Sequence, residues 1–121
     1  MIELHRSECS ILPLVLKRRW FDMIKSGEKQ QEYRDMTDYW AKRLFNWDRK
    51  PGTHVVEFRL GYASDAPRVA FHCPRLITRG GLRSYCCVNE CVHFQWGEPR
   101  HPHYLLQLGQ PVTFIQGESN V

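Results

Sequence analysis

The sequence predicts a small α+β domain in which two or more short helices pack on an open, barrel-like antiparallel sheet of about five to six strands. Three observations lead to this prediction: a helical pattern near the N-terminus, a second one with a capping signal, and a C-terminal half in which strand-like segments alternate with turns. The 121 residues leave room for one hydrophobic core. We therefore expect a single domain over 1–115, followed by a flexible polar tail over 116–121.

The first helix is expected over Lys17–Ser26, because its apolar residues recur with helical spacing and its charged residues fall elsewhere. Gly27 follows where a helix can end in a residue of positive φ, which glycine adopts without a Cβ clash. Thr37 or Asp38 can cap a second helix, since either side chain can accept a hydrogen bond from a free backbone N–H. We assign four aromatic residues of these and later segments to the core: Trp20, Phe21, Trp40 and Phe58.

The strand-like segments have apolar runs or alternating apolar and polar residues, and turn residues separate several of them. Pro74 weakens one of them, because proline cannot donate a ladder hydrogen bond. Beyond Gly109, the last strand is expected to continue. The expected strands are Leu12–Leu16, Gln31–Arg34, Val55–Leu60, Arg68–Ile77 and His103–Leu108, with Val112–Ile115 as the continuation.

Charge and hydropathy limit the class of partner. The formal net charge of +4 favours a polyanionic partner without requiring one. The charged residues in Met1–Ser10 are atypical of a secretory signal, and the longest apolar run, Ile11–Leu16, is too short to cross a bilayer. We therefore expect a cytoplasmic protein without a membrane partner. The sequence requires no metal or organic cofactor and leaves the oligomeric state open.

The segment Gly27–Arg34 concentrates the groups most suited to binding. Residues two apart in a strand share a face, so Glu32 and Arg34 are expected to point into one cleft, over which Lys29 can bend. Arginine offers a planar fork of donors, lysine a point charge and glutamate an acceptor, a combination suited to a polar planar ligand. The alternative is a solvated strand edge with a weak ion pair, worth about 0–1 kcal/mol.

Gly27-Glu28-Lys29-Gln30-Gln31-Glu32-Tyr33-Arg34 matches the pattern GxKxxExR and resembles the signature of the ASCH domain family, whose fold is a PUA-like β-barrel. Further ordered matches resemble the short ASCH proteins of bacteria and their phages. These are Trp20-Phe21-x-x-Ile24, Tyr39-Trp40-x-x-Arg43-Leu44, Phe58-Arg59-x-Gly61-Tyr62, and Trp96-Gly97 followed by Tyr104-x-x-x-Leu108-Gly109.

The resemblance implies a cleft beside the first helix that is lined by Lys29, Glu32 and Arg34 and binds RNA, a nucleoside or a nucleotide. One branch of the family hydrolyses N4-acetylcytidine with a Lys and a Thr of this motif and a Glu from a later insert. Only the Lys carries over, as Lys29, because Glu32 occupies the Thr position. If the chain is an amidohydrolase, Lys29 is expected as nucleophile or base, with Glu32 handling protons.

Several residues around the motif have two interpretations. Tyr33 and Tyr62 can stack on bases, and Arg59 either lines the cleft rim or lies on a solvated strand face. The run Lys17-Arg18-Arg19 either contacts phosphate or is a solvated helix face. A third hypothesis for the whole chain is a protein-interaction domain of a phage or mobile element. The expected ligand-binding set is Gly27, Lys29, Glu32, Tyr33, Arg34, Arg59 and Tyr62.

The five cysteines raise the question of a zinc site. Four of them lie near histidines in the C-terminal half, but their spacing does not give two Cys-x2–4-Cys pairs. We interpret them as free thiols, as expected in a reducing compartment, and predict no metal. The residues concerned are Cys73, Cys86, Cys87, Cys91, His72, His93, His101 and His103.

Overall fold

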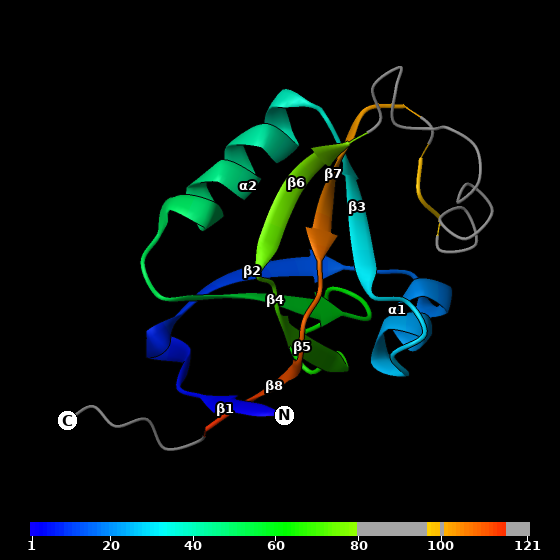
Figure 1. The fold of residues 1–121 in the computed structure, drawn as a ribbon. Helices are drawn as coiled ribbons and strands as arrows, with labels where there is room; N and C mark the ends of the chain where they lie inside the picture. Colours follow the sequence, from blue (N-terminus) through cyan, green and yellow to red (C-terminus); the bar gives the residue numbers. More distant parts are fainter. Residues whose placement is uncertain (80–96, 100, 116–121) are drawn as a thin grey trace.

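Two β-sheets and two α-helices make up the computed structural model, which describes residues 1–79, 97–99 and 101–115 (Figure 1). The order along the chain is β1 (Ile2–Leu4), β2 (Cys9–Val15), α1 (Arg18–Lys25), β3 (Gln31–Asp35), α2 (Asp38–Arg49), β4 (Thr53–Arg59), β5 (Arg68–His72), β6 (Arg75–Arg79), β7 (His103–Gln107) and β8 (Pro111–Phe114). A short 3-10 helix, Arg6–Glu8, separates β1 from β2. The predicted α+β class is therefore confirmed.

The sheets differ in part from the prediction. One contains five strands in the order β1-β8-β5-β4-β2, and the other contains three in the order β3-β7-β6. The expectation of an antiparallel sheet is wrong for the larger one, because β1 runs parallel to β8 and β2 runs parallel to β4. The described strands also exceed the expected five to six, and they form two separate sheets rather than one open, barrel-like sheet.

Two predicted strands have a different course. The segment Arg68–Ile77 is two strands in different sheets, since Pro74 interrupts the ladder between β5 and β6. The segment after Gly109 does not extend β7. Instead, Gly109 N donates to His72 O at 2.7 Å and His72 N donates to Gln110 O at 2.9 Å, so the chain crosses to β5 and forms β8.

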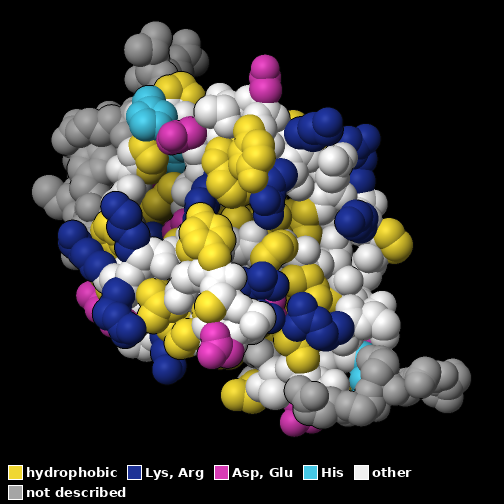
Figure 2. Space-filling model, turned by 180° about the vertical axis from the view of Figure 1, so that it is seen from behind, with side chains coloured by type: hydrophobic (Ala, Val, Ile, Leu, Met, Phe, Trp, Pro, Cys, Tyr) yellow, Lys and Arg dark blue, Asp and Glu magenta, His cyan; other side chains and the backbone are white. Residues whose placement is uncertain are grey.

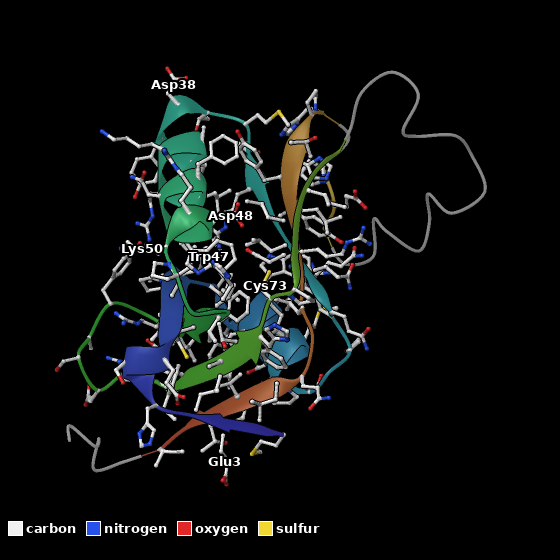
Figure 3. All side chains as sticks on the ribbon, turned by 60° about the vertical axis from the view of Figure 1, so that its left-hand side comes forward. Glu3, Asp38, Trp47, Asp48, Lys50 and Cys73 are labelled. Carbon is white, nitrogen blue, oxygen red and sulfur yellow. The ribbon has the colours of Figure 1, made fainter. Side chains whose placement is uncertain are left out.

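Both predicted helices are present. α1 lies within the expected range, and Gly27 follows it with a φ of 88°, as the glycine stop predicts. Thr37 caps α2, because its side chain accepts a hydrogen bond from Trp40 N at 3.2 Å. Trp47 Nε1 donates to Ser10 O at 2.9 Å and Ser10 Oγ donates to Trp47 O at 2.8 Å, which fixes α2 to β2. Figure 3 shows Trp47 on the side of α2 that faces the sheets.

One hydrophobic cluster joins the two sheets and both helices. Phe21 of α1, Leu44 of α2, Phe58 of β4 and Leu106 of β7 are buried in it, which confirms the assignment of Phe21 and Phe58 to the core. Trp20 and Trp40 are only partly buried and pack against its edge. Among the described residues, neither helix has the length and apolar composition needed to cross a membrane. The expected tail, 116–121, lies outside these residues.

Candidate functional site

Lys29 lies in the loop between α1 and β3, where its side chain is only 4% exposed. The backbone holds it there, because Lys29 N donates to Met23 O at 2.9 Å across the helix end that Gly27 closes. Its Nζ donates to Glu32 Oε1 at 2.9 Å. A buried ammonium needs a counter-charge, and Glu32 supplies it.

Glu32 is buried between two cations. While one carboxylate oxygen accepts from Lys29, Oε2 accepts from Arg34 Nη2 at 2.7 Å. The register places Glu32 opposite Leu106 and Arg34 opposite Tyr104, so both point to the side of the small sheet that carries core residues. With two cations and one carboxylate, the group carries a net positive charge. The solvated-edge interpretation of these residues is therefore wrong.

Aromatic rings flank both cations. Lys29 Nζ lies 4.4 Å from the ring centroid of Trp20 and 5.4 Å from that of Tyr33. The Arg34 guanidinium lies 4.8 Å from the ring centroid of Trp40. Trp40 also faces Arg43, at 5.3 Å. Figure 2 shows hydrophobic side chains interleaved with Lys and Arg side chains on the face seen from behind.

Gly97 packs closely against Trp20, one of these aromatic residues. It has a φ of 83°, and a Cβ there would come within 2.9 Å of Cη2 of Trp20. Only glycine therefore lets the backbone lie this close to the indole. The next residue, Glu98, is fully buried with His103, whose Nε2 lies 3.0 Å from Glu98 Oε2. His103 also meets the Tyr33 ring edge-on at 5.6 Å.

A cavity of about 380 Å³ opens beside the motif. Gly27 and Lys29 line it from one side, and Phe71, Leu108 and Pro111 supply an apolar wall. Glu32 and Arg34 do not line this cavity. Lys29 is thus the residue that connects the buried charge network to a space in which a ligand can lie.

The structure brings together five of the seven predicted ligand-binding residues, which lie in one loop and the strand after it: Gly27, Lys29, Glu32, Tyr33 and Arg34. The other two lie elsewhere. Tyr62 is 90% exposed in the turn after β4, and Arg59 Nη2 donates to Glu57 Oε1 at 3.0 Å on the large sheet. Sequence reasoning missed the Glu98–His103 pair, since neither residue stands in a recognisable spacing.

Glu57 is a second buried carboxylate that sequence reasoning missed. Its side chain is only 4% exposed, and it accepts from Arg6 and Arg59 at 3.0 Å each. Burial by itself would raise the pKa of Glu57, but the hydrogen bonds and charges of Arg6 and Arg59 outweigh burial and lower it. Because Glu57 alternates with the apolar residues Val56 and Phe58, the sequence predicts that it lies on a polar outer face of the strand. The alternation does not show that the Glu57 side chain is buried.

Only some of the cysteines and histidines considered for a zinc site lie in the described part of the chain. Cys86, Cys87, Cys91 and His93 lie outside the described part of the chain. Within the described part, no three His, Cys, Asp or Glu side chains are placed to hold a metal ion. Cys73 lies at the junction of β5 and β6 (Figure 3), and burial raises the pKa of its thiol to about 12. Of the basic run, Arg18 is 73% exposed, while the Arg19 guanidinium lies 4.5 Å from the Trp20 ring centroid.

Comparisons with protein-family models, with curated proteins and with solved structures find no match to this chain.

Replacing Glu32 with Gln tests the charge network. The variant Glu32→Gln keeps the shape of the side chain but removes the charge between Lys29 and Arg34. We expect the free energy of unfolding to fall by about 3–5 kcal/mol, the usual cost of stranding a buried charge. Equilibrium urea denaturation measures it. The exposed carboxylate of the same loop provides the control, Glu28→Gln, for which we expect almost no change.

The same substitution in a Lys29→Met background separates the network from a general loss of packing. With one cation already removed, Glu32→Gln is expected to cost clearly less than in the wild type. An equal cost in the two backgrounds would show that Lys29 and Glu32 are not energetically coupled.

The lowered pKa of Glu57 predicts that the free energy of unfolding depends on pH. Because its pKa is lower in the folded chain than in the unfolded one, its stabilisation is complete above the unfolded value of about 4.3 and is lost as the pH falls through the folded value. The difference in melting temperature between wild type and Glu57→Gln should therefore be largest near neutral pH and shrink in acid. Glu3, which points away from the fold in Figure 3, gives the control Glu3→Gln. A difference that stays constant with pH contradicts this assignment.

Proposed function

We propose that the protein binds RNA, a nucleoside or a nucleotide at the Lys29 cavity. The observation that carries the proposal is the position of Lys29, which lines the cavity together with Phe71. Its buried ammonium is held by Glu32 and lies over the rings of Trp20 and Tyr33. Charge and aromatic surface together are what a nucleotide requires, since it combines an anionic or carbonyl-rich edge with a flat ring.

Lys29 has donors to spare for such a ligand. An ammonium has three N–H donors, and among the described residues Glu32 is the hydrogen-bond acceptor for Lys29 Nζ. The remaining donors suit a phosphate or a base carbonyl oxygen. The net positive charge of Lys29, Glu32 and Arg34 favours an anionic ligand over a cationic one.

We also propose that the two sheets are a variant of the PUA-like fold of the ASCH family. Support comes from the ordered motif matches and from the position of Gly27–Arg34 between the first helix and a strand of the small sheet.

Hydrolysis of an acylated nucleoside is the less favoured alternative. A nucleophilic or basic Lys29 needs a neutral amine, whereas Glu32 at 2.9 Å stabilises a positive charge. Both carboxylate oxygens of Glu32 already accept hydrogen bonds from cations, Oε1 from Lys29 and Oε2 from Arg34, so neither is free to act on a substrate. These contacts favour binding over catalysis by the motif.

Calorimetry and thermal shift with nucleosides, nucleotides and short single-stranded RNAs test the proposal. We expect the wild type to bind at least one of these, and Lys29→Met to bind it more than tenfold more weakly, because one charge-assisted hydrogen bond is lost. The control is Lys42→Ala, which removes an exposed positive charge from α2 and should bind like the wild type.

Three outcomes are informative. Equal binding by the wild type and a folded Lys29→Met variant would contradict the assignment of the site. A folded wild type that binds none of the ligands would contradict the function and favour the protein-interaction hypothesis. Release of acetate or another acid from an acylated ligand, detected by product analysis, would replace the binding proposal with the enzymatic one.

A further inference from the structure

A second charged site lies on the other face of the large sheet. Val56 and Phe58 of β4 point into the main core, so Glu57 and Arg59 point to the opposite side. On that side, Arg6, Arg59 and Arg68 all lie within 4 Å of the Glu57 carboxylate, at 3.0, 3.0 and 3.8 Å. Nothing in the motif or in the proposed function uses this group.

The positive charges outnumber the negative one. In the register of β4 and β5, Arg59 lies directly opposite Arg68, and like charges in that position repel. Among the described residues, Glu57 is the carboxylate that these guanidiniums contact. Three guanidiniums and one carboxylate leave a net charge of +2, which a bound anion would reduce.

The arginines also retain unused donors. Arg59 Nε is buried and has no hydrogen-bond partner among the described residues. A buried donor without an acceptor is costly. Arg68 uses one nitrogen on Ser64 O, at 2.9 Å, and its Nη1 is too far from Glu57 for a good hydrogen bond.

A cavity of about 340 Å³ lies beside this group. Its charged lining residues are Lys25, Glu57 and Arg68, and most of the remaining wall is apolar, including Val112 and Phe114 of β8. Ala70 lies opposite Glu57 in the register, and its small side chain leaves the space open. The Arg6 guanidinium lies over the ring of Phe114, 4.5 Å from its centroid.

We propose that this cavity binds a small organic anion, a phosphate or carboxylate group carried on an apolar body. The anionic group lies against Arg68, and the apolar body lies against Ala70, Val112 and Phe114. The volume suits a small molecule and the walls are mostly apolar, which disfavours free phosphate and any polymer as the occupant. The proposal does not depend on nucleotide binding at Lys29.

Phenyl phosphate and phenylacetate test the site. Inorganic phosphate, which has the anionic group without an apolar body, and benzyl alcohol, which has the apolar body without a charge, are the control ligands. We expect saturable binding of phenyl phosphate or phenylacetate by calorimetry or NMR titration, and the stronger of the two identifies the anionic group. Arg68→Gln leaves the two shorter pairs of Glu57 intact and should weaken binding about tenfold or more. Arg18→Gln removes the same charge from an exposed position and should have no effect.

A second variant tests the cavity without changing any charge. Ala70→Leu fills the space opposite Glu57 and should weaken binding as strongly as Arg68→Gln, provided that its circular dichroism spectrum is that of the wild type. The proposal is overturned if the wild type shows no saturable binding, if Arg68→Gln binds like the wild type, or if inorganic phosphate binds as tightly as phenyl phosphate.

Discussion

The arrangement of the motif depends on the two ion pairs that the buried carboxylate of Glu32 makes. The carboxylate accepts from Lys29, whose backbone is tied to α1, and from Arg34, whose guanidinium lies over Trp40 of α2. One buried anion thereby connects the first helix, the first strand of the small sheet and the second helix. Since two cations and a carboxylate are costly to desolvate, packing alone does not account for their burial.

A preformed charge network has a consequence for ligand binding. Lys29 and Arg34 are held in place by Glu32 before any ligand arrives, so less side-chain entropy is lost on binding. The aromatic rings of Trp20, Tyr33 and Trp40 restrict the cations further. In the proposed binding function, the motif is the rigid part of the site and the adjoining cavity selects the ligand.

Local signals predicted much of the fold. Gly27 and Thr37 ended and began helices as their chemistry predicts, and Pro74 marked a true break. Pairing between distant segments was not predictable in the same way. The segment of β8 was expected to continue β7, and it pairs instead with β5. The burial of charged side chains was the other feature that the sequence did not predict. Spacing placed Lys29 and Glu32 near each other, but only tertiary contacts show that Glu32 and Glu57 lie in the interior.

The central claim is that Lys29 is a buried ammonium at the point of ligand contact. NMR detection of lysine NH3⁺ groups tests it directly, because an ammonium shielded from water and hydrogen-bonded to Glu32 exchanges its protons slowly. We predict one such protected signal, absent in Lys29→Met, that shifts when a nucleotide or short RNA is added while the exposed lysines do not. The account is wrong if the ammonium protons of Lys29 exchange as fast as those of the surface lysines, or if the Lys29 signal does not shift with any ligand that binds.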